Sequence, residues 1–180
     1  MPTSPMKAKI SLEAIKALRE KTNASLNEVR AALESAHGDE TKALAFLRER
    51  GAAIAEKRQG RATGQGRIET YVHHDGRLAA IVEVNCETDF VARTPEFQQF
   101  CRDVAMQVAA MSPRYLRKED VPSGESLDAE AIKAACLLEQ PFVKDQGATL
   151  NDMLKALIAN TGENIVIRRF ARFAVGEPAA

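Results

Sequence analysis

Several features that mark large classes of protein are missing from this sequence. Lys and Arg number 25, and so do Asp and Glu, so the net charge is zero and the basic excess typical of nucleic-acid-binding proteins is absent. No apolar run reaches the ~18 residues of a membrane span, and residues 1–5 lack the apolar core of a signal peptide. We therefore expect a cytoplasmic protein that binds neither nucleic acid nor a membrane directly.

Cysteines are few, and common catalytic motifs do not occur. Cys86, Cys101 and Cys136 form neither a CxxC pair nor a disulfide framework, which is typical of free, mostly buried thiols in a reducing compartment. The phosphate-binding G-x-x-x-x-G-K-[ST], nucleophile G-x-S-x-G and dinucleotide-binding G-x-G-x-x-G motifs are missing. Nothing in these patterns supports an enzyme, and we expect neither catalytic residues nor a cofactor.

A metal site and a reactive thiol are the two chemical alternatives. The candidate ligands are His73, His74, Cys86 and Asp89. Adjacent strand residues point to opposite faces, so the two histidines should diverge, and no second ligand pair has zinc spacing. A nucleophilic cysteine needs an electropositive setting, whereas the neighbours of Cys86 in the sequence are acidic. We expect no metal and no thiol chemistry, which leaves binding as the function.

What the sequence does contain is the composition of a globular protein, with 45% apolar and 28% charged residues. Apolar side chains recur at helical spacing in three short segments: Leu12, Ile15 and Leu18; Leu26, Val29 and Leu33; Leu44 and Leu47. Ser25 and Glu28 form an S-x-x-E capping box at the start of the second segment, and Gly38 with Asp39 separates it from the third. These signals predict a three-helix domain over residues 1–52.

Small and basic residues dominate the stretch that follows. Its first part can extend the preceding helix, but three glycines between residues 60 and 66 are typical of a linker. We predict a linker over residues 53–66 and a second domain over residues 67–180.

Strand signals occur at both ends of this second domain. Residues 68–73 and 78–85 are rich in β-branched and apolar side chains, and Asp75-Gly76 is a strong hairpin turn signal between them. The final segment, residues 164–175, alternates like a strand but is apolar on both faces. Such a strand needs cover on both sides, either by helices or by another subunit.

Helical signals lie between these strands. Thr94 and Pro95 cap a helix. Its core-facing stripe is Phe97, Phe100, Cys101, Val104, Val108 and Met111. Residues 126–139 and 149–160 predict two further helices. The fold class that we predict is α+β.

The connection after the hairpin, EVNCETDFVAR over residues 83–93, places Asp89 beside Phe90. Connecting segments run over the surface, where a large apolar side chain is hard to bury. Either a partner buries the Phe90 ring, which is worth roughly 2–3 kcal/mol, or the ring packs under its own loop. The residues themselves leave both alternatives open.

These residues resemble a known family. NCETDFVAR, followed by a helix opening at TPEF, is similar to the signature of the bacterial translation elongation factor Ts family. LREKTNASLNEVRAALESAHGDETKALAFLRERG resembles the three-helix, ubiquitin-associated-like domain of that family, and TGENIVIRRF resembles its closing strand. The three segments occur in the family's order and span nearly the whole chain.

The resemblance implies a guanine-nucleotide exchange factor for the GTPase elongation factor Tu. The three-helix domain would grip the partner's G domain, and a core of a small antiparallel sheet packed with helices would complete the chain. Asp89 and Phe90 would insert between two helices of that domain and disturb its magnesium site and phosphate loop, so that GDP leaves and GTP can bind. The contact positions implied for this chain are Thr88, Asp89, Phe90, Val91 and Ala92; Arg19, Leu26, Asn27 and Arg30; and Gln107, Thr161 and Gly162.

The sequence departs from the family pattern in three places. SLDAEAIKAACLLEQPFVKD runs on directly where many members have a second core repeat or a helical hairpin, so this is a short, single-core form. Gln107 replaces a histidine that is frequent in the family, and Thr161 replaces a larger apolar residue before Gly162. Short forms are expected to form homodimers through the core. An alternative function is a protein-binding module without exchange activity, which uses the three-helix domain while the core only dimerises.

Overall fold

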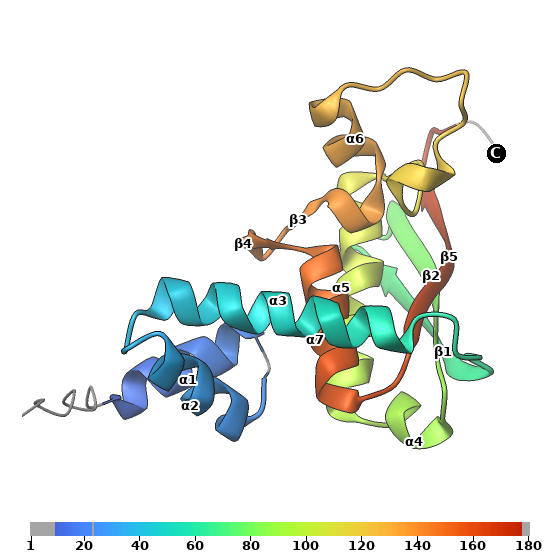
Figure 1. The fold of residues 1–180 in the computed structure, drawn as a ribbon. Coiled ribbons are helices and arrows are strands. Elements are labelled where there is room, and N and C mark those ends of the chain that lie inside the picture. The colour runs from blue at the N-terminus through green and yellow to red at the C-terminus, as the bar shows by residue number, and fades with distance from the viewer. Residues whose placement is uncertain (1–9, 23, 178–180) are drawn as a thin grey trace, which may run out of the picture. The chain divides into compact units, whose positions relative to one another are not determined.

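A computed structural model describes residues 10–22 and 24–177 of the chain (Figure 1). It combines α-helices with a three-stranded and a two-stranded antiparallel sheet, which confirms the predicted α+β class. The described residues form two compact units. The first comprises the residues up to 59 together with residues 155–162, and the second comprises residues 60–154 and those from 163 onward.

Three helices build most of the first unit: α1 (Leu12–Thr22), α2 (Leu26–Ser35) and α3 (Glu40–Arg58). They enclose a small core of Ile15, Leu18, Val29, Ala32, Leu33, Ala43 and Leu47. The predicted capping box of α2 is confirmed. The Ser25 Oγ accepts from the Glu28 N–H at 3.3 Å, and the Glu28 Oε2 accepts from the Ser25 N–H at 3.2 Å.

Two leucines expected on the buried side of these helices lie outside that core. Leu12 is 80% exposed and Leu26 is 55% exposed. Each is the first residue of its helix, so its side chain stands beyond the end of the buried stripe. The periodicity therefore predicts the helices correctly but the burial of their first residues wrongly.

Most of the stretch expected to be a linker has regular structure. Residues 53–58 belong to α3, and residues 65–66 belong to the first strand, which leaves residues 59–64 between the two. Ala, Glu, Lys and Arg all favour a helix, and no glycine stands between Gly51, inside α3, and Gly60. The helix therefore continues until that glycine ends it.

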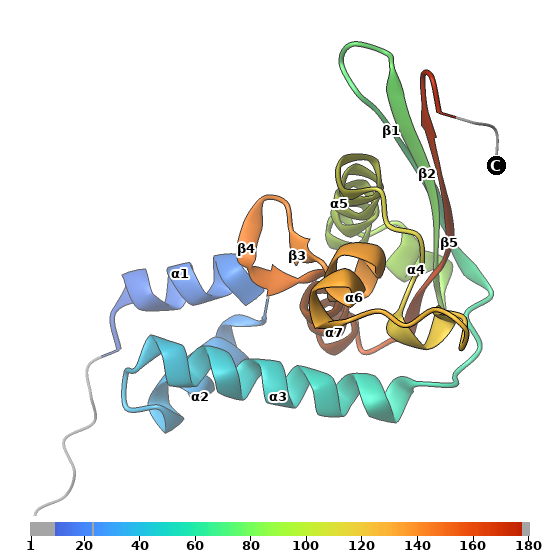
Figure 2. The ribbon, with the colours of Figure 1, turned by 90° about the horizontal axis from the view of Figure 1, so that it is seen from above.

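The main sheet of the second unit has the order β1-β2-β5, with both neighbouring pairs antiparallel. Its strands are β1 (Gln65–Val72), β2 (Leu78–Cys86) and β5 (Ile165–Ala174). The β1–β2 hairpin confirms the prediction from the Asp75-Gly76 signal. Helix α5 (Pro95–Met111) packs on all three strands and covers one face of the sheet (Figures 1 and 2).

The core of the second unit lies between α5 and the covered face of the sheet. Its buried residues include Ala80, Val82, Val84, Cys86, Ile165 and Ile167 from the strands, and Phe97, Phe100, Cys101, Val104 and Val108 from α5. The Thr94 hydroxyl caps α5 by accepting from the Phe97 N–H at 3.3 Å, as predicted. Met111, expected on the same stripe, is 43% exposed because it is the last residue of the helix.

Strand β5 changes its buried face at a β-bulge. Residues 83–84 of β2 pair with Arg169 and Ile167, so Arg168 is an extra residue in β5. One extra residue reverses the alternation of a strand. Phe173, which the sequence pattern places on the same face as Ile167, is therefore 66% exposed on the opposite face.

Shorter elements complete the chain. They are the 3-10 turns η1 (Lys118–Asp120) and η2 (Leu137–Glu139), helices α6 (Ala129–Ala135) and α7 (Leu150–Thr161), and strands β3 (Pro141–Phe142) and β4 (Asp145–Thr149). Helix α7 confirms its prediction. The helix expected over residues 126–139 is divided, because Cys136 has an extended backbone between α6 and η2. The β3–β4 pair was not anticipated from the sequence.

Candidate partner-binding site

The residues between β2 and α5 fold into one further helical turn, α4 (Asp89–Ala92), which the sequence did not predict. Thr88 is its N-cap, and the Thr88 hydroxyl accepts from the Val91 N–H at 3.4 Å. Phe90, the second residue of the turn, is 78% exposed. The alternative that this ring packs under its own loop is therefore wrong, and the ring is available to a partner.

Polar and apolar chemistry meet on the surface of α4. The Asp89 carboxylate lies 2.8 Å from the Arg93 guanidinium, and both side chains remain accessible to solvent. An exposed ion pair of this kind contributes little to stability, so a partner can engage the carboxylate at little cost to the fold. Val91 and Ala92 are half-buried where α4 packs on β1, β2 and α5.

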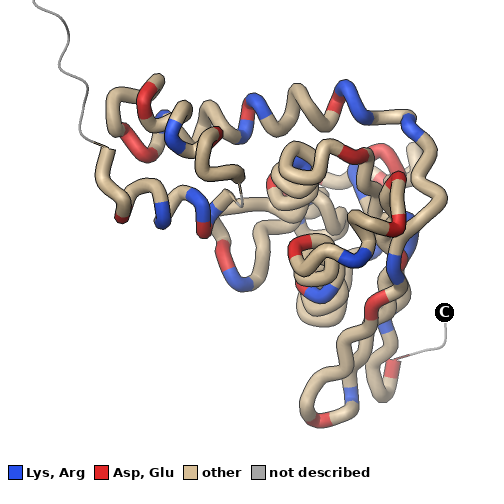
Figure 3. Tube along the Cα trace, turned by 90° about the horizontal axis from the view of Figure 1, so that it is seen from below, with Lys and Arg blue, Asp and Glu red and all other residues tan. Residues whose placement is uncertain are grey.

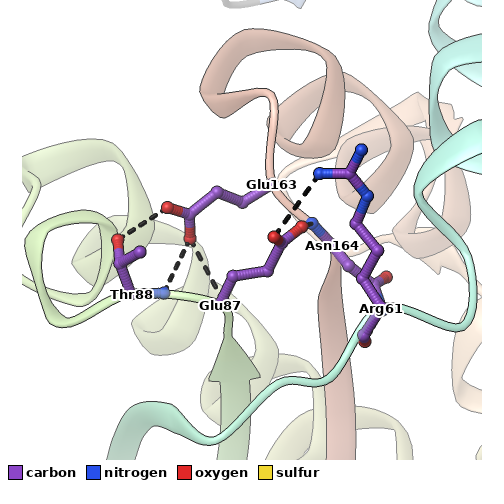
Figure 4. A network of polar contacts seen from close by, with 5 residues as sticks. All are labelled: Arg61, Glu87, Thr88, Glu163 and Asn164. Atoms are coloured by element: carbon purple, nitrogen blue, oxygen red, sulfur yellow. Dashed lines mark hydrogen bonds and ion pairs between the residues drawn. The ribbon is translucent and has the colours of Figure 1, made fainter.

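A carboxylate from a distant part of the sequence holds the start of this turn (Figure 4). Glu163, in the connection between α7 and β5, accepts from the backbone N–H groups of Glu87 and Thr88 at 3.1 and 3.0 Å. Its other oxygen accepts from the Thr88 hydroxyl at 2.6 Å. One side chain therefore satisfies three donors at the N-terminus of α4.

The same junction is joined in the opposite direction. The Glu87 carboxylate accepts from the Asn164 backbone N–H at 2.7 Å and lies 3.6 Å from the Arg61 guanidinium. Asn164 in turn donates from its side chain to the Arg61 carbonyl at 2.8 Å. Each carboxylate thus accepts from backbone N–H groups of the other segment, next to the paired ends of β2 and β5, as Figure 4 shows. Sequence reasoning missed these residues, because no local pattern links positions about 75 apart.

The predicted contact residues of the three-helix unit are all on its surface. Arg19 of α1 and Leu26, Asn27 and Arg30 of α2 are exposed. Leu26 and Arg30 are four residues apart, which places them on neighbouring turns of one helix face. The structure therefore leaves an apolar side chain and a guanidinium accessible together on α2.

Gln107 differs from the other predicted contacts, because it is fully buried in α5. Its amide nitrogen donates to the Gln140 side chain and to the Pro141 carbonyl at 3.1 and 3.0 Å. Its amide oxygen accepts from the Val143 N–H at 2.9 Å. No surface of Gln107 is open to a partner in this conformation, and its visible role is to hold the β3 segment on α5.

Thr161 and Gly162 lie at the end of α7, directly before Glu163. The Thr161 hydroxyl donates to the Leu157 carbonyl at 2.8 Å. Gly162 has a φ of +71°, which ends the helix in a left-handed conformation that other residues rarely adopt. Both residues are half-buried, so they expose only part of their surface.

The structure bears on both chemical alternatives, the metal site and the reactive thiol. His73 and His74 do not diverge: their ring centroids are 4.2 Å apart, because β1 ends at Val72 and strand alternation stops there. Within residues 10–22 and 24–177, no three His, Cys, Asp or Glu side chains are grouped to hold a metal ion. Burial, reinforced by the negative charge of Glu163, raises the pKa of the Cys86 thiol to about 11. A thiol with this pKa is a poor nucleophile.

Acidic and basic positions are interspersed along the trace (Figure 3). The helices found in the described residues are all too short or too polar to cross a membrane.

Several known proteins that resemble this chain share one name. A family model described as Elongation factor TS matches residues 8–130. Elongation factor Ts of Carboxydothermus hydrogenoformans is 45% identical, over 93% of this chain and 90% of its own length. The proteins of the same name from Caldanaerobacter subterraneus subsp. tengcongensis and Thermotoga neapolitana are 45% and 43% identical, each over 93% of this chain and 98% of its own length. These relatives match over nearly their whole length, so their overall extent is similar to that of this chain.

Proposed function

This chain belongs to the elongation factor Ts family, and from that premise we propose that it is a guanine-nucleotide exchange factor for elongation factor Tu. It would bind the GDP-bound GTPase and promote release of GDP, so that GTP can enter. No bond is made or broken by this chain in that role, and we propose that it is not an enzyme. The working compartment that we propose is the cytoplasm.

The observation that carries the proposal is the exposed Phe90 ring on a turn that is fixed to the core. Burying such a ring in a partner is worth roughly 2–3 kcal/mol. Asp89 precedes it on the same turn and offers a carboxylate to polar groups of the partner. We propose that this pair is inserted between two helices of the partner's G domain, close to its magnesium site and phosphate loop.

The three-helix unit has a different role in this proposal. Arg19, Leu26, Asn27 and Arg30 would anchor the partner's G domain and contribute affinity. Thr161 and Gly162 would contribute contacts from the end of α7. Gln107 is buried, so we propose that it acts indirectly, by holding the segment around Val143 in place.

Exchange of this kind is a coupling between two binding sites on elongation factor Tu and must be reciprocal. If the factor weakens GDP binding, then GDP weakens binding of the factor by the same ratio. The proposal therefore predicts that added nucleotide releases the factor from its partner.

The uncovered face of the sheet supports a homodimer. Apolar side chains remain exposed there on all three strands: Ile68, Val72, Ile81 and Phe173. A second copy packed on this face would bury them, and stable interfaces commonly bury about 1,600 Å² in total. Light scattering that finds only the 19.7 kDa monomer at micromolar concentration would contradict the dimer.

Stopped-flow fluorescence tests the exchange function directly. Elongation factor Tu loaded with fluorescent GDP is mixed with excess unlabelled GDP, with and without this protein. We expect release to accelerate with the concentration of the factor until it saturates. Binding without acceleration would instead support the alternative of a binding module without exchange activity.

A further inference from the structure

We propose that Glu163 is a positioning residue for Asp89 and Phe90: it completes the N-terminal cap of α4 from a distant part of the sequence and so fixes the turn that presents the ring. The proposal rests on the proposed function, because it gives Glu163 a part in nucleotide exchange, which it would exert through Phe90.

The first step is a comparison with an ordinary capping box. In such a box the third helical residue is Glu or Gln, whose side chain accepts from the N–H of the N-cap residue. Helix α4 has Thr88 as its N-cap, but its third residue is Val91, which has no acceptor. The Glu163 carboxylate takes that place, at 3.0 Å from the Thr88 nitrogen.

The second step concerns how much the turn depends on this carboxylate. A single helical turn is unfavourable to nucleate on its own, and no residue of α4 is fully buried. Bonds to an ionised acceptor are roughly twice as strong as neutral ones, and Glu163 receives three of them from Glu87 and Thr88. The carboxylate is therefore a main support of the turn.

The third step connects the cap to Phe90. The Thr88 hydroxyl donates its hydrogen to Glu163, which leaves the oxygen free to accept from the Val91 N–H. Phe90 lies between these two residues in the turn. Because its ring is 78% exposed, its direction is set by the backbone of the turn and not by packing of the ring.

The fourth step is that Glu163 itself is held. Gly162 turns the chain out of α7, and the next residue, Asn164, donates its N–H to Glu87 at 2.7 Å. Cys86 and Ile165, on either side of this contact, are paired in the sheet. The support of α4 is thus attached to the paired ends of β2 and β5.

Amide hydrogen exchange in the free protein, followed by NMR, tests the cap without any partner. In Glu163→Ala the amides of Glu87 and Thr88 should exchange about tenfold faster or more, the factor that corresponds to about 1.4 kcal/mol. The amides of α2 serve as the internal control and should not change. Unaltered exchange at Glu87 and Thr88 would overturn the proposal.

Two conservative variants keep the test informative. Glu163→Gln retains an acceptor oxygen for the two backbone groups but not the charge, so their amides should exchange faster than in wild type and slower than in Glu163→Ala. Glu163→Asp retains the charge but has a shorter side chain, so the Thr88 amide should lose protection in this variant. It therefore tests the cap if Glu163→Ala does not fold. Loss in the Gln variant with retention in the Asp variant would show that charge alone matters, which contradicts a cap.

A double-mutant cycle on GDP release tests the connection to Phe90. We expect Glu163→Ala to slow the saturated release rate of wild type about tenfold, but that of Phe90→Ala by no more than about twofold, because residues that act through one another are not additive. Equal effects in both backgrounds would mean that Glu163 does not act through Phe90.

The two failures are distinguishable. If the wild-type protein does not accelerate GDP release at all, the proposed function is wrong, whatever the hydrogen exchange shows. If wild type is active and Glu163→Ala loses amide protection without losing exchange activity, the function stands and the positioning role is wrong.

Discussion

Two exposed apolar side chains, Leu26 and Phe90, occupy similar positions in helices that are stabilised differently. Leu26 is the first residue of α2 and Phe90 is the second residue of α4. Each follows a hydroxyl N-cap whose backbone N–H is bound by a glutamate. For α2 that glutamate is Glu28, three residues from Ser25; for α4 it is Glu163, 75 residues from Thr88.

This difference separates the roles that the two units can have. The N-cap N–H at the start of α2 is bound by a glutamate of the same helix. The start of α4 is hydrogen-bonded to the end of the β-sheet, so a force that a partner exerts on Phe90 acts on the core as well. A locally capped helix suits an anchor that contributes affinity, whereas a turn supported by the core suits a side chain that must push a partner apart.

The largest effect is expected at Phe90. Phe90→Ala removes the ring that we propose is buried in the partner, and an anchor of that kind is worth on the order of 2 kcal/mol or more. A loss of about 2 kcal/mol corresponds to roughly a thirtyfold weaker acceleration of GDP release. The melting temperature of the free protein should barely change, because the ring is exposed. Stopped-flow GDP release and thermal unfolding on the same sample measure both quantities.

Phe46→Ala is the matched control for that variant. Phe46 is another exposed phenylalanine, 41% accessible on α3, and no proposed contact includes it. Normal exchange by Phe90→Ala, or an equal loss in both variants, would contradict a specific role for Phe90.

A smaller effect is expected at Leu26. Leu26→Ala should weaken binding to elongation factor Tu about tenfold, the consequence of losing about 1.4 kcal/mol. The release rate at saturating factor should stay unchanged, because the proposal assigns affinity to Leu26 and acceleration of release to Phe90. Titration of the factor in the GDP-release assay separates the two quantities. A lower saturated rate with an unchanged half-saturation concentration would contradict the roles assigned to Leu26 and Phe90.

Next comes the local cap itself. Glu28→Ala removes half of the α2 capping box and should destabilise the three-helix unit by about 1 kcal/mol. Exchange of the Thr88 amide should not respond, since Glu28 lies in the other unit. Urea unfolding followed by circular dichroism gives the first quantity and NMR the second. Faster exchange at Thr88 in this variant would mean that the two caps are coupled.

The same contrast explains how much could be predicted from the sequence. The capping box, the hairpin turn and the start of α5 involve residues within a few positions of one another, and each of these predictions is confirmed. The support of α4 involves residues 75 positions apart, which no periodicity reveals. The exposure of Phe173 depends on a bulge at Arg168 that alternation does not signal.

The candidate site shows a similar division. Resemblance to the family pointed to Thr88–Ala92 and to the α2 surface, and these residues are accessible or form the exposed turn. It also pointed to Gln107, whose amide is used inside the chain. The sequence pattern around a polar residue on an apolar helix stripe is the same whether its side chain binds a partner or a neighbouring loop. The burial of Gln107 could therefore not be predicted from the sequence.

The smallest effect is expected from alkaline pH, which should destabilise the unit that carries α4, in part through the Cys86 thiol. The Cys86 thiol donates to the Thr88 carbonyl at 3.1 Å, whereas the described part of the three-helix unit contains no cysteine. Burial raises the pKa of this thiol to about 11, above the value of about 8.5 for an unfolded chain. A group whose pKa is raised by folding contributes its full stability below the unfolded pKa and loses it as the pH rises through the folded one. Between pH 7 and pH 9 the expected loss of unfolding free energy is therefore about 1 kcal/mol or less.

Urea unfolding of wild type and Cys86→Ala at both pH values isolates this thiol, because Cys101 and Cys136 are common to the two proteins. An identical pH dependence in the two would show that Cys86 titrates no differently in the folded and unfolded chain.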